Sequence, residues 1–163
     1  MQNHTRHTSA ALVAALALLA SPALAESPKP PTIDRLRAYL IWEDSGELSK
    51  NLAKSTEQIV ANTEKGTSAQ MLVDVVLTAK GDSLYADKQP MLYIYVLPMG
   101  AQVGDPAMID TGFPISYIAK GGELTRSVIV EHGCNGFSFS ARVMVEDKII
   151  SQLDKDYSIT CGD

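Results

Sequence analysis

Side chains able to carry metal, redox or nucleophilic chemistry are scarce in this sequence, which has two cysteines and three histidines. It contains no C-x-x-C pair, so neither a thioredoxin-like centre nor covalent haem attachment is supported. It also lacks the G-x-S-x-G turn of an α/β-hydrolase nucleophile. The Gly121-Gly122 pair does not lead into a helix that could bind phosphate, and residues 105–110 hold too few acids for a calcium loop. We therefore expect no cofactor and no metal, and motifs assign no catalytic residue.

Basic residues are in the minority. One of the 14 basic residues and none of the 19 acidic residues precede position 26, so the remainder carries 13 minus 19, a formal charge of −6. No basic run and no interleaving of basic and aromatic residues offsets this charge. Because such a surface repels phosphate backbones, we do not expect a nucleic-acid partner.

Long hydrophobic runs are missing, apart from a short one near the amino terminus. Ala10–Ala20 is apolar throughout but is about half the ~20 residues that cross a bilayer, so no transmembrane anchor is expected. Arg6 precedes this run, and a proline and an A-x-A ending at Ala25 follow it, as in a secretory signal peptide. We predict cleavage between Ala25 and Glu26 and a periplasmic or secreted protein. The alternative is a buried amino-terminal helix.

The two cysteines, Cys134 and Cys161, both follow the predicted cleavage point. In an oxidising compartment, two cysteines in a small domain are expected to form one disulfide. Such a bridge would hold a carboxyl-terminal strand that would otherwise fray. The alternative is a metal site made by the cysteines and His132, for which a fourth ligand is not obvious.

Alternating apolar residues dominate the chain after a proline-rich leader at 26–34, and they predict a single domain over residues 35–163. Trp42 is expected on the inward face of the first strand. Met91–Leu97 is apolar on both faces, which is typical of a strand covered on both sides. The predicted strands lie near residues 36–42, 70–80, 91–97, 113–119, 124–131, 137–145, 149–153 and 157–161. Seven or eight short strands indicate an all-β fold, an immunoglobulin-like antiparallel β-sandwich.

Three segments between strands carry further predictions. Residues 44–63 have apolar residues at roughly helical spacing and two possible capping boxes, which predict one or two short helices between the first two strands. These helices could cover the open face of Met91–Leu97. Glycine and proline predict a long loop from Met99 to Gly112, and Lys120–Glu123 predicts a β-hairpin.

Two kinds of function fit these predictions. Tyr93 and Tyr95 share one face of a strand, and Tyr39 could line the first strand in a similar way. If exposed, these tyrosines would form a surface for a protein partner or a ligand; if the helices cover them, they would be core residues. The second kind is a small hydrolase that uses His132 as a base or the loop acids Asp105 and Asp110. We favour a non-enzymatic binding or accessory module, and a structural component of the cell envelope is a third possibility.

Several short features follow one another in a recognisable order. An aromatic first strand leads into Gly46-x-Leu48-Ser49-x-Asn51, the valine-rich Leu72–Leu77 follows, and Cys134 precedes a terminal Cys161-Gly162. This order resembles a set of small secreted bacterial β-sandwich proteins of unknown function. The chain departs from the set at 62–66, where those proteins often have a tryptophan before a glycine-rich turn. The resemblance implies secretion and a β-sandwich, but no activity.

Overall fold

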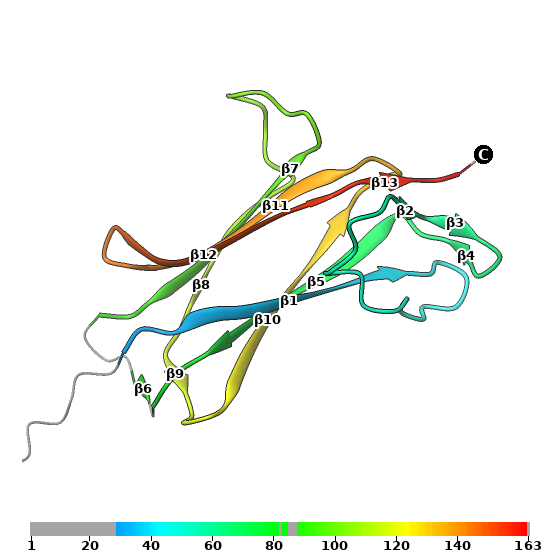
Figure 1. Ribbon diagram of the computed structural model, residues 1–163. Coiled ribbons are helices and arrows are strands. Elements are labelled where there is room, and N and C mark those ends of the chain that lie inside the picture. The colour runs from blue at the N-terminus through cyan, green and yellow to red at the C-terminus, as the bar shows by residue number, and fades with distance from the viewer. Residues whose placement is uncertain (1–28, 82, 85–87, 163) are drawn as a thin grey trace, which may run out of the picture.

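A computed structural model describes residues 29–81, 83–84 and 88–162, and this part of the chain contains strands and no helix (Figure 1). The all-β, antiparallel class predicted from the alternation is confirmed. The predicted signal peptide and its cleavage site at Ala25 lie outside the described residues. β1 begins at Thr32, inside the segment predicted as a leader.

The first large sheet has three antiparallel strands in the order β1-β5-β10. They are β1 (Thr32–Ile41), β5 (Gln70–Thr78) and β10 (Glu123–Glu131). Ala38 and Val128 both lie opposite Val73, so alternate residues of the three strands face inward together. On the outer face, Asp74 is buried and binds Arg37 Nη2 at 3.0 Å and Ser127 Oγ at 2.7 Å, which ties the three strands together.

The second large sheet has four antiparallel strands in the order β12-β11-β7-β8. They are β12 (Lys148–Tyr157), β11 (Phe137–Val145), β7 (Met91–Pro98) and β8 (Ile109–Pro114). The short strands are β2 (Ile59–Val60), β3 (Asn62–Thr63), β4 (Gly66–Thr67), β6 (Ser83–Leu84), β9 (Tyr117–Ile118) and β13 (Ile159–Thr160). β13 pairs in parallel with β2.

The inward faces of both sheets contribute to one hydrophobic core. Trp42 is 6% exposed and belongs to this core, as its position in the alternation predicts. The fully buried side chains come from strands of both sheets, and the largest are Tyr157, Phe137, Phe139, Leu40 and Met71. Burial of these side chains against one another, rather than hydrogen bonding between the sheets, holds the two layers together.

The short helices predicted within 44–63 are absent, and that prediction is wrong. The segment instead turns after Trp42 and runs back beside β1, where Leu48 forms an antiparallel bridge with Ile41. The physical reason lies in β1, which is an edge strand of its sheet and has one row of backbone groups without a strand partner. In a helix, the backbone N–H and C=O groups of this segment would bond to one another. Here they form hydrogen bonds with the free edge of β1 instead.

Two polar side chains complete the cover over the edge of β1. Ser49 Oγ accepts a hydrogen bond from Leu40 N at 3.0 Å. Asn51 Oδ1 accepts one from Ala38 N at 3.0 Å and another from Ala53 N at 3.0 Å. Ser49 and Asn51 are the polar positions of the Gly46-x-Leu48-Ser49-x-Asn51 feature, so this short sequence protects a strand edge.

The region around β8 also differs from the prediction. The predicted loop runs to Gly112, but β8 already begins at Ile109 and pairs with β7, so the loop is shorter. The turn at Gly121 exists and connects β9 to β10. These two strands do not pair with each other, because β9 pairs with β6 and β10 pairs with β5, so the predicted hairpin is wrong. β8 lies at the edge of its sheet, where glycine and proline are tolerated, and this explains why its sequence resembles a loop.

Candidate functional site

The outer face of β7 presents two neighbouring tyrosines. Leu92, Ile94 and Val96 point into the core, whereas Tyr93 and Tyr95 point outward with 41% and 39% of their surfaces exposed. The predicted helical cover over this strand does not exist in the described chain. We call the outward side chains of β7, together with their neighbours on β8, β11 and β12, the tyrosine face.

Tyr93 lies against a glycine of the edge strand β8. Gly112 is opposite Tyr93 in the register, and a Cβ added to Gly112 would lie 3.1 Å from Cε1 and 3.3 Å from Cδ1 of the tyrosine ring. The ring therefore covers the backbone of β8, a contact that any larger residue at Gly112 would displace. Such packing of an aromatic ring on an edge glycine stabilises a strand pair. Tyr93 thus has a structural contact as well as an exposed surface.

Two acidic residues lie in the same cross-strand row as Tyr95. Asp110 of β8 and Ser140 of β11 lie on either side of it, and Asp154 of β12 follows beyond Ser140. Gln152 Nε2 donates to Asp154 Oδ2 at 2.6 Å, which fixes one of these carboxylates. Ser140 Oγ is buried without a hydrogen-bond partner in the described structure. The row through Tyr95 therefore combines an aromatic ring with negative charge.

A shallow hollow of about 330 Å³ lies at the Met91 end of the tyrosine face. Tyr93, Met91 and Met144 form its apolar part. Lys88 and Glu146 stand at its border as an ion pair with a separation of 2.9 Å. The face is thus slightly concave beside Tyr93.

Tyr39 does not join Tyr93 and Tyr95. It lies opposite Leu72 on the outward side of β1, so it belongs to the other sheet and to the opposite outer face of the molecule. The structure therefore brings together two of the three tyrosines that the sequence suggested as a surface. Sequence reasoning did not include Asp110, Arg142 or Asp154 in this surface. Alternation on each strand could indicate their outward direction, but not that their strands flank β7.

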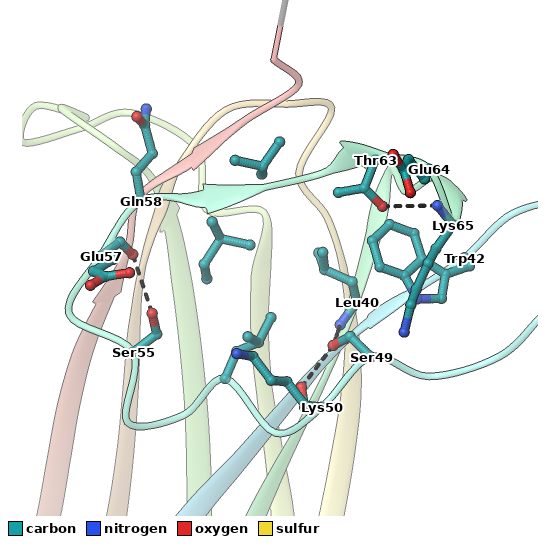
Figure 2. Close-up of a pocket in the computed structure, with 13 residues that line it drawn as sticks. Leu40, Trp42, Ser49, Lys50, Ser55, Glu57, Gln58, Thr63, Glu64 and Lys65 are labelled. Carbon is teal, nitrogen blue, oxygen red and sulfur yellow. Dashed lines mark hydrogen bonds between the residues drawn. The ribbon is translucent and has the colours of Figure 1, made fainter.

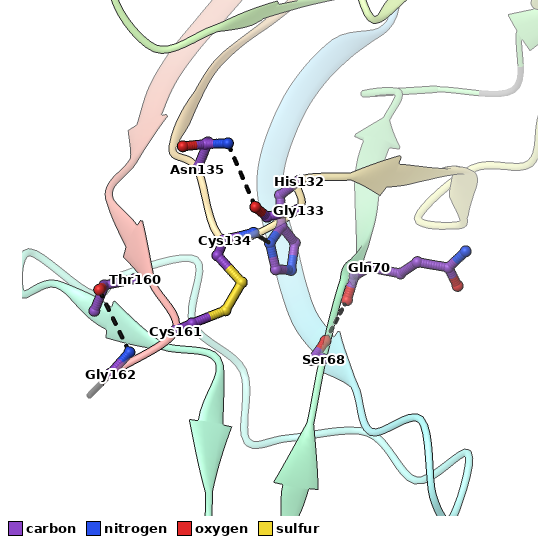
Figure 3. The surroundings of a disulfide bond; sticks show 9 residues. All are labelled: Ser68, Gln70, His132, Gly133, Cys134, Asn135, Thr160, Cys161 and Gly162. Atoms are coloured by element: carbon purple, nitrogen blue, oxygen red, sulfur yellow. Dashed lines mark hydrogen bonds between the residues drawn. A yellow bond between two sulfur atoms is a disulfide. The ribbon is translucent and has the colours of Figure 1, made fainter.

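The disulfide between Cys134 and Cys161 is confirmed, with a Cα–Cα distance of 5.1 Å (Figure 3). It joins the turn after β10 to the end of the described chain. Gly133 and Cys134 have positive φ angles of 50° and 66°, and Asn135 N closes the turn on His132 O at 2.8 Å. Because both sulfurs are bonded to each other, the alternative metal site is wrong, and no metal-binding cluster occurs among the residues that the structure describes.

His132 has a structural position beside the disulfide. It is 3% exposed, and its Nδ1 accepts a hydrogen bond from Cys134 N at 3.2 Å (Figure 3). Nε2 is buried and has no hydrogen-bond partner of good geometry among the residues that the structure describes. Burial lowers the pKa of His132, while the backbone of Gln70 and the charge of Glu43 act weakly in the opposite direction.

A general base needs a nitrogen that a substrate can reach, and neither nitrogen of His132 meets this requirement. A hollow of about 630 Å³ lies beside His132 and is lined in part by Glu131, which is exposed and accepts a hydrogen bond from Gln70 Nε2 at 3.5 Å. Asp105 Oδ2 accepts from Gln102 N at 2.7 Å and holds the tip of the β7–β8 loop, whereas Asp110 belongs to the tyrosine face. The residues suggested for a hydrolase therefore do not converge.

No family model and no curated protein sequence matches this chain. Among solved structures, a β-glucuronidase of Bifidobacterium dentium, determined in complex with coumarin-3-O-glucuronide, aligns with 80% of this chain at 10% identity and a TM-score of 0.40. The chain covers 18% of that enzyme's length. A similarity of this degree assigns neither a family nor an activity.

Within the described part of the chain, there is no helix of the length and hydrophobicity needed to cross a membrane.

Proposed function

We propose that this protein is a non-enzymatic binding module and that the tyrosine face is its contact surface for a partner protein. The observation that carries this proposal is the side-by-side exposure of Tyr93 and Tyr95 on the central part of a regular sheet. A pleated sheet holds both rings in fixed positions, so a partner can bury them at little conformational cost. Tyrosine is also enriched among the residues that dominate binding energy in interfaces.

Charge on the same face indicates the chemistry of the partner. Asp110, Asp154 and Asp156 occupy outward positions on this sheet, and Arg142, opposite Tyr93, is the basic residue among them. This excess of carboxylates favours a partner whose contact patch is basic around an apolar centre. Opposite charges at the border would speed association at low salt, and the two tyrosines would supply most of the affinity.

The deciding experiment is affinity capture from the native periplasm with the exported protein, followed by measured binding of the captured partner. Tyr93→Thr and Tyr95→Thr keep strand propensity while removing the rings. Each is expected to weaken binding by roughly 30-fold or more, the effect of removing an interface hot spot. Tyr117→Thr is the matched control, because Tyr117 is 51% exposed on β9, outside the tyrosine face.

The outcomes distinguish the candidate functions. Loss of the partner with both β7 variants and retention with Tyr117→Thr supports the proposal, as does affinity that falls with rising salt. Equal binding by all variants removes the tyrosine face from the function. A structural envelope component predicts that none of the three substitutions matters, and a hydrolase predicts turnover that depends on His132 or on the loop acids.

Secretion and an immunoglobulin-like sandwich belong to the same proposal. The disulfide supports an oxidising compartment. The strand orders β1-β5-β10 and β12-β11-β7-β8 fit an immunoglobulin-like arrangement, although the disulfide joins a turn to the chain end rather than one sheet to the other. Mass spectrometry of exported protein is expected to find Glu26 at its amino terminus; an intact Met1 would contradict export by this route.

A further inference from the structure

A cleft of about 640 Å³ separates the segment 43–58 from the β3–β4 hairpin (Figure 2). It lies at the end of the molecule that carries β2, β3 and β4, away from the centre of β7 (Figure 1). Its volume is in the range of sites that hold small organic ligands. The side chains of Leu40, Trp42, Leu52, Ile59 and Val60 supply its apolar surface.

The apolar surface of the cleft is preformed, and part of it is exposed to water. Leu40, Trp42 and Ile59 are held by the hydrophobic core, whereas Val60 is 43% exposed. A ligand that covered Val60 would remove apolar surface from water without requiring the core to rearrange, and it would touch Trp42 and Ile59 only at the 6% of each that is exposed. An apolar ligand body therefore fits this surface.

The hydroxyl groups around the cleft are engaged by the chain itself. Ser49 Oγ accepts from Leu40 N at 3.0 Å and donates to Lys50 O at 2.8 Å. Ser55 Oγ donates to Glu57 O at 3.3 Å, and Thr63 Oγ1 accepts from Lys65 N at 3.1 Å (Figure 2). A sugar or another ligand rich in hydroxyl groups would find few free hydrogen-bonding partners here. The remaining polar determinant is charge.

Lys65 brings that charge to the apolar surface. Figure 2 shows its side chain running from the hairpin down beside Trp42. Glu57 and Glu64 also line the cleft, and Glu57 lies on the opposite side of it from Lys65. Lys50 lines the same cleft. Neither lysine forms an ion pair with a residue that the structure describes.

We propose that this cleft binds an amphipathic anion, whose apolar body packs on Trp42, Ile59 and Val60 and whose charged head binds the ammonium group of Lys65. The ligand class follows from an apolar floor, engaged hydroxyls and the place of Lys65 beside Trp42, where it forms no ion pair with Glu64, Glu57 or another described residue. The site is separate from the tyrosine face and does not depend on it.

The chain contains one tryptophan, Trp42, so its fluorescence reports on this cleft alone. The experiment titrates the exported protein with decanoate below its micelle-forming concentration, with decyltrimethylammonium as the cationic probe of equal chain length. Calorimetry of the same mixtures provides a second measurement. We expect saturable binding of decanoate and at least tenfold weaker binding of the cation. Octanoate should bind up to about 15-fold more weakly than decanoate, because each buried methylene contributes about fourfold.

Substitutions locate the charged head. Lys65→Met is expected to weaken decanoate binding by roughly three- to tenfold, since it removes a charge-assisted contact that remains partly exposed. Lys65→Arg keeps the charge and should bind within about twofold of the native chain. Lys54→Met is the matched control, because Lys54 is an exposed lysine of segment 43–58, which borders the cleft, but does not itself line it.

Three results would overturn the proposal: no saturable signal by either method, equal binding of the two probes, or a Lys65→Met variant that binds like Lys54→Met. Thermal unfolding of each variant confirms that it is folded. Lys65 is an exposed residue of a hairpin turn, where substitutions usually change stability by less than about 0.5 kcal/mol.

Discussion

Replacing Asn51 by alanine tests the cover over β1 most directly. Its Oδ1 is the acceptor for Ala38 N, at 3.0 Å, and Ala38 is fully buried. Without the amide, this N–H would be left in the protein without a partner, which costs about 1–3 kcal/mol. The second bond, to Ala53 N, is exposed and adds about 0.5 kcal/mol. The expected loss is therefore about 1.5–3.5 kcal/mol in the free energy of unfolding.

The assay is urea unfolding followed by circular dichroism, with Asn51→Asp and Asn62→Ala as controls. Asn51→Asp keeps an oxygen in the same place and should cost less than about 1 kcal/mol. Asn62 is exposed on β3, and its replacement should stay within about 0.5 kcal/mol of the native chain. Hydrogen exchange at the Ala38 amide should become faster in Asn51→Ala alone.

The reasoning is refuted if Asn51→Ala and Asn62→Ala have the same stability, or if exchange at Ala38 does not change. In that case water or a shifted backbone would replace the side-chain acceptor. The segment 48–52 would then be a loose cover and not part of the sheet's hydrogen bonding.

Two further predictions concern the disulfide end of the molecule. The Cys134–Cys161 bond closes a loop with a sequence separation of 27. Reducing it should lower the free energy of unfolding by roughly 3–4 kcal/mol and the melting temperature by about 10 °C, measured by calorimetry with and without reductant. An unchanged melting temperature would mean that the bridge is unimportant. Burial lowers the pKa of His132 in the folded chain. Above about pH 6.5 the imidazole is neutral in both the folded and the unfolded chain, so the free energy of unfolding has its full value there. Below that pH the unfolded chain binds a proton before the folded chain does, and stability is lost. The unfolding free energy should then fall by up to about 1.4 kcal/mol per pH unit as the pH drops below 6.5, a slope that His132→Gln should abolish; equal slopes in the two proteins would contradict the buried neutral histidine.

The alternation in the sequence determined much of the fold. Leu36, Ala38 and Leu40 face the core, as do the alternate residues of β5 and β11, because a pleated strand with one buried face leaves no other register for them. The disulfide followed from the small number of cysteines. Tyr93 and Tyr95 could likewise be placed on one face of a strand from their spacing alone.

The tertiary structure alone decided how these strands meet and what remains exposed. Residues 44–63 have helical spacing, but the unpaired edge of β1 offers hydrogen-bond partners that a local pattern cannot reveal. β8 contains glycine and proline, and only its place at a sheet edge makes it a strand. The exposure of Tyr93 and Tyr95, and the separation of Tyr39 from them, depend on which strands are neighbours. Spacing along a chain sets the direction of each side chain, whereas contacts between distant segments set what covers it.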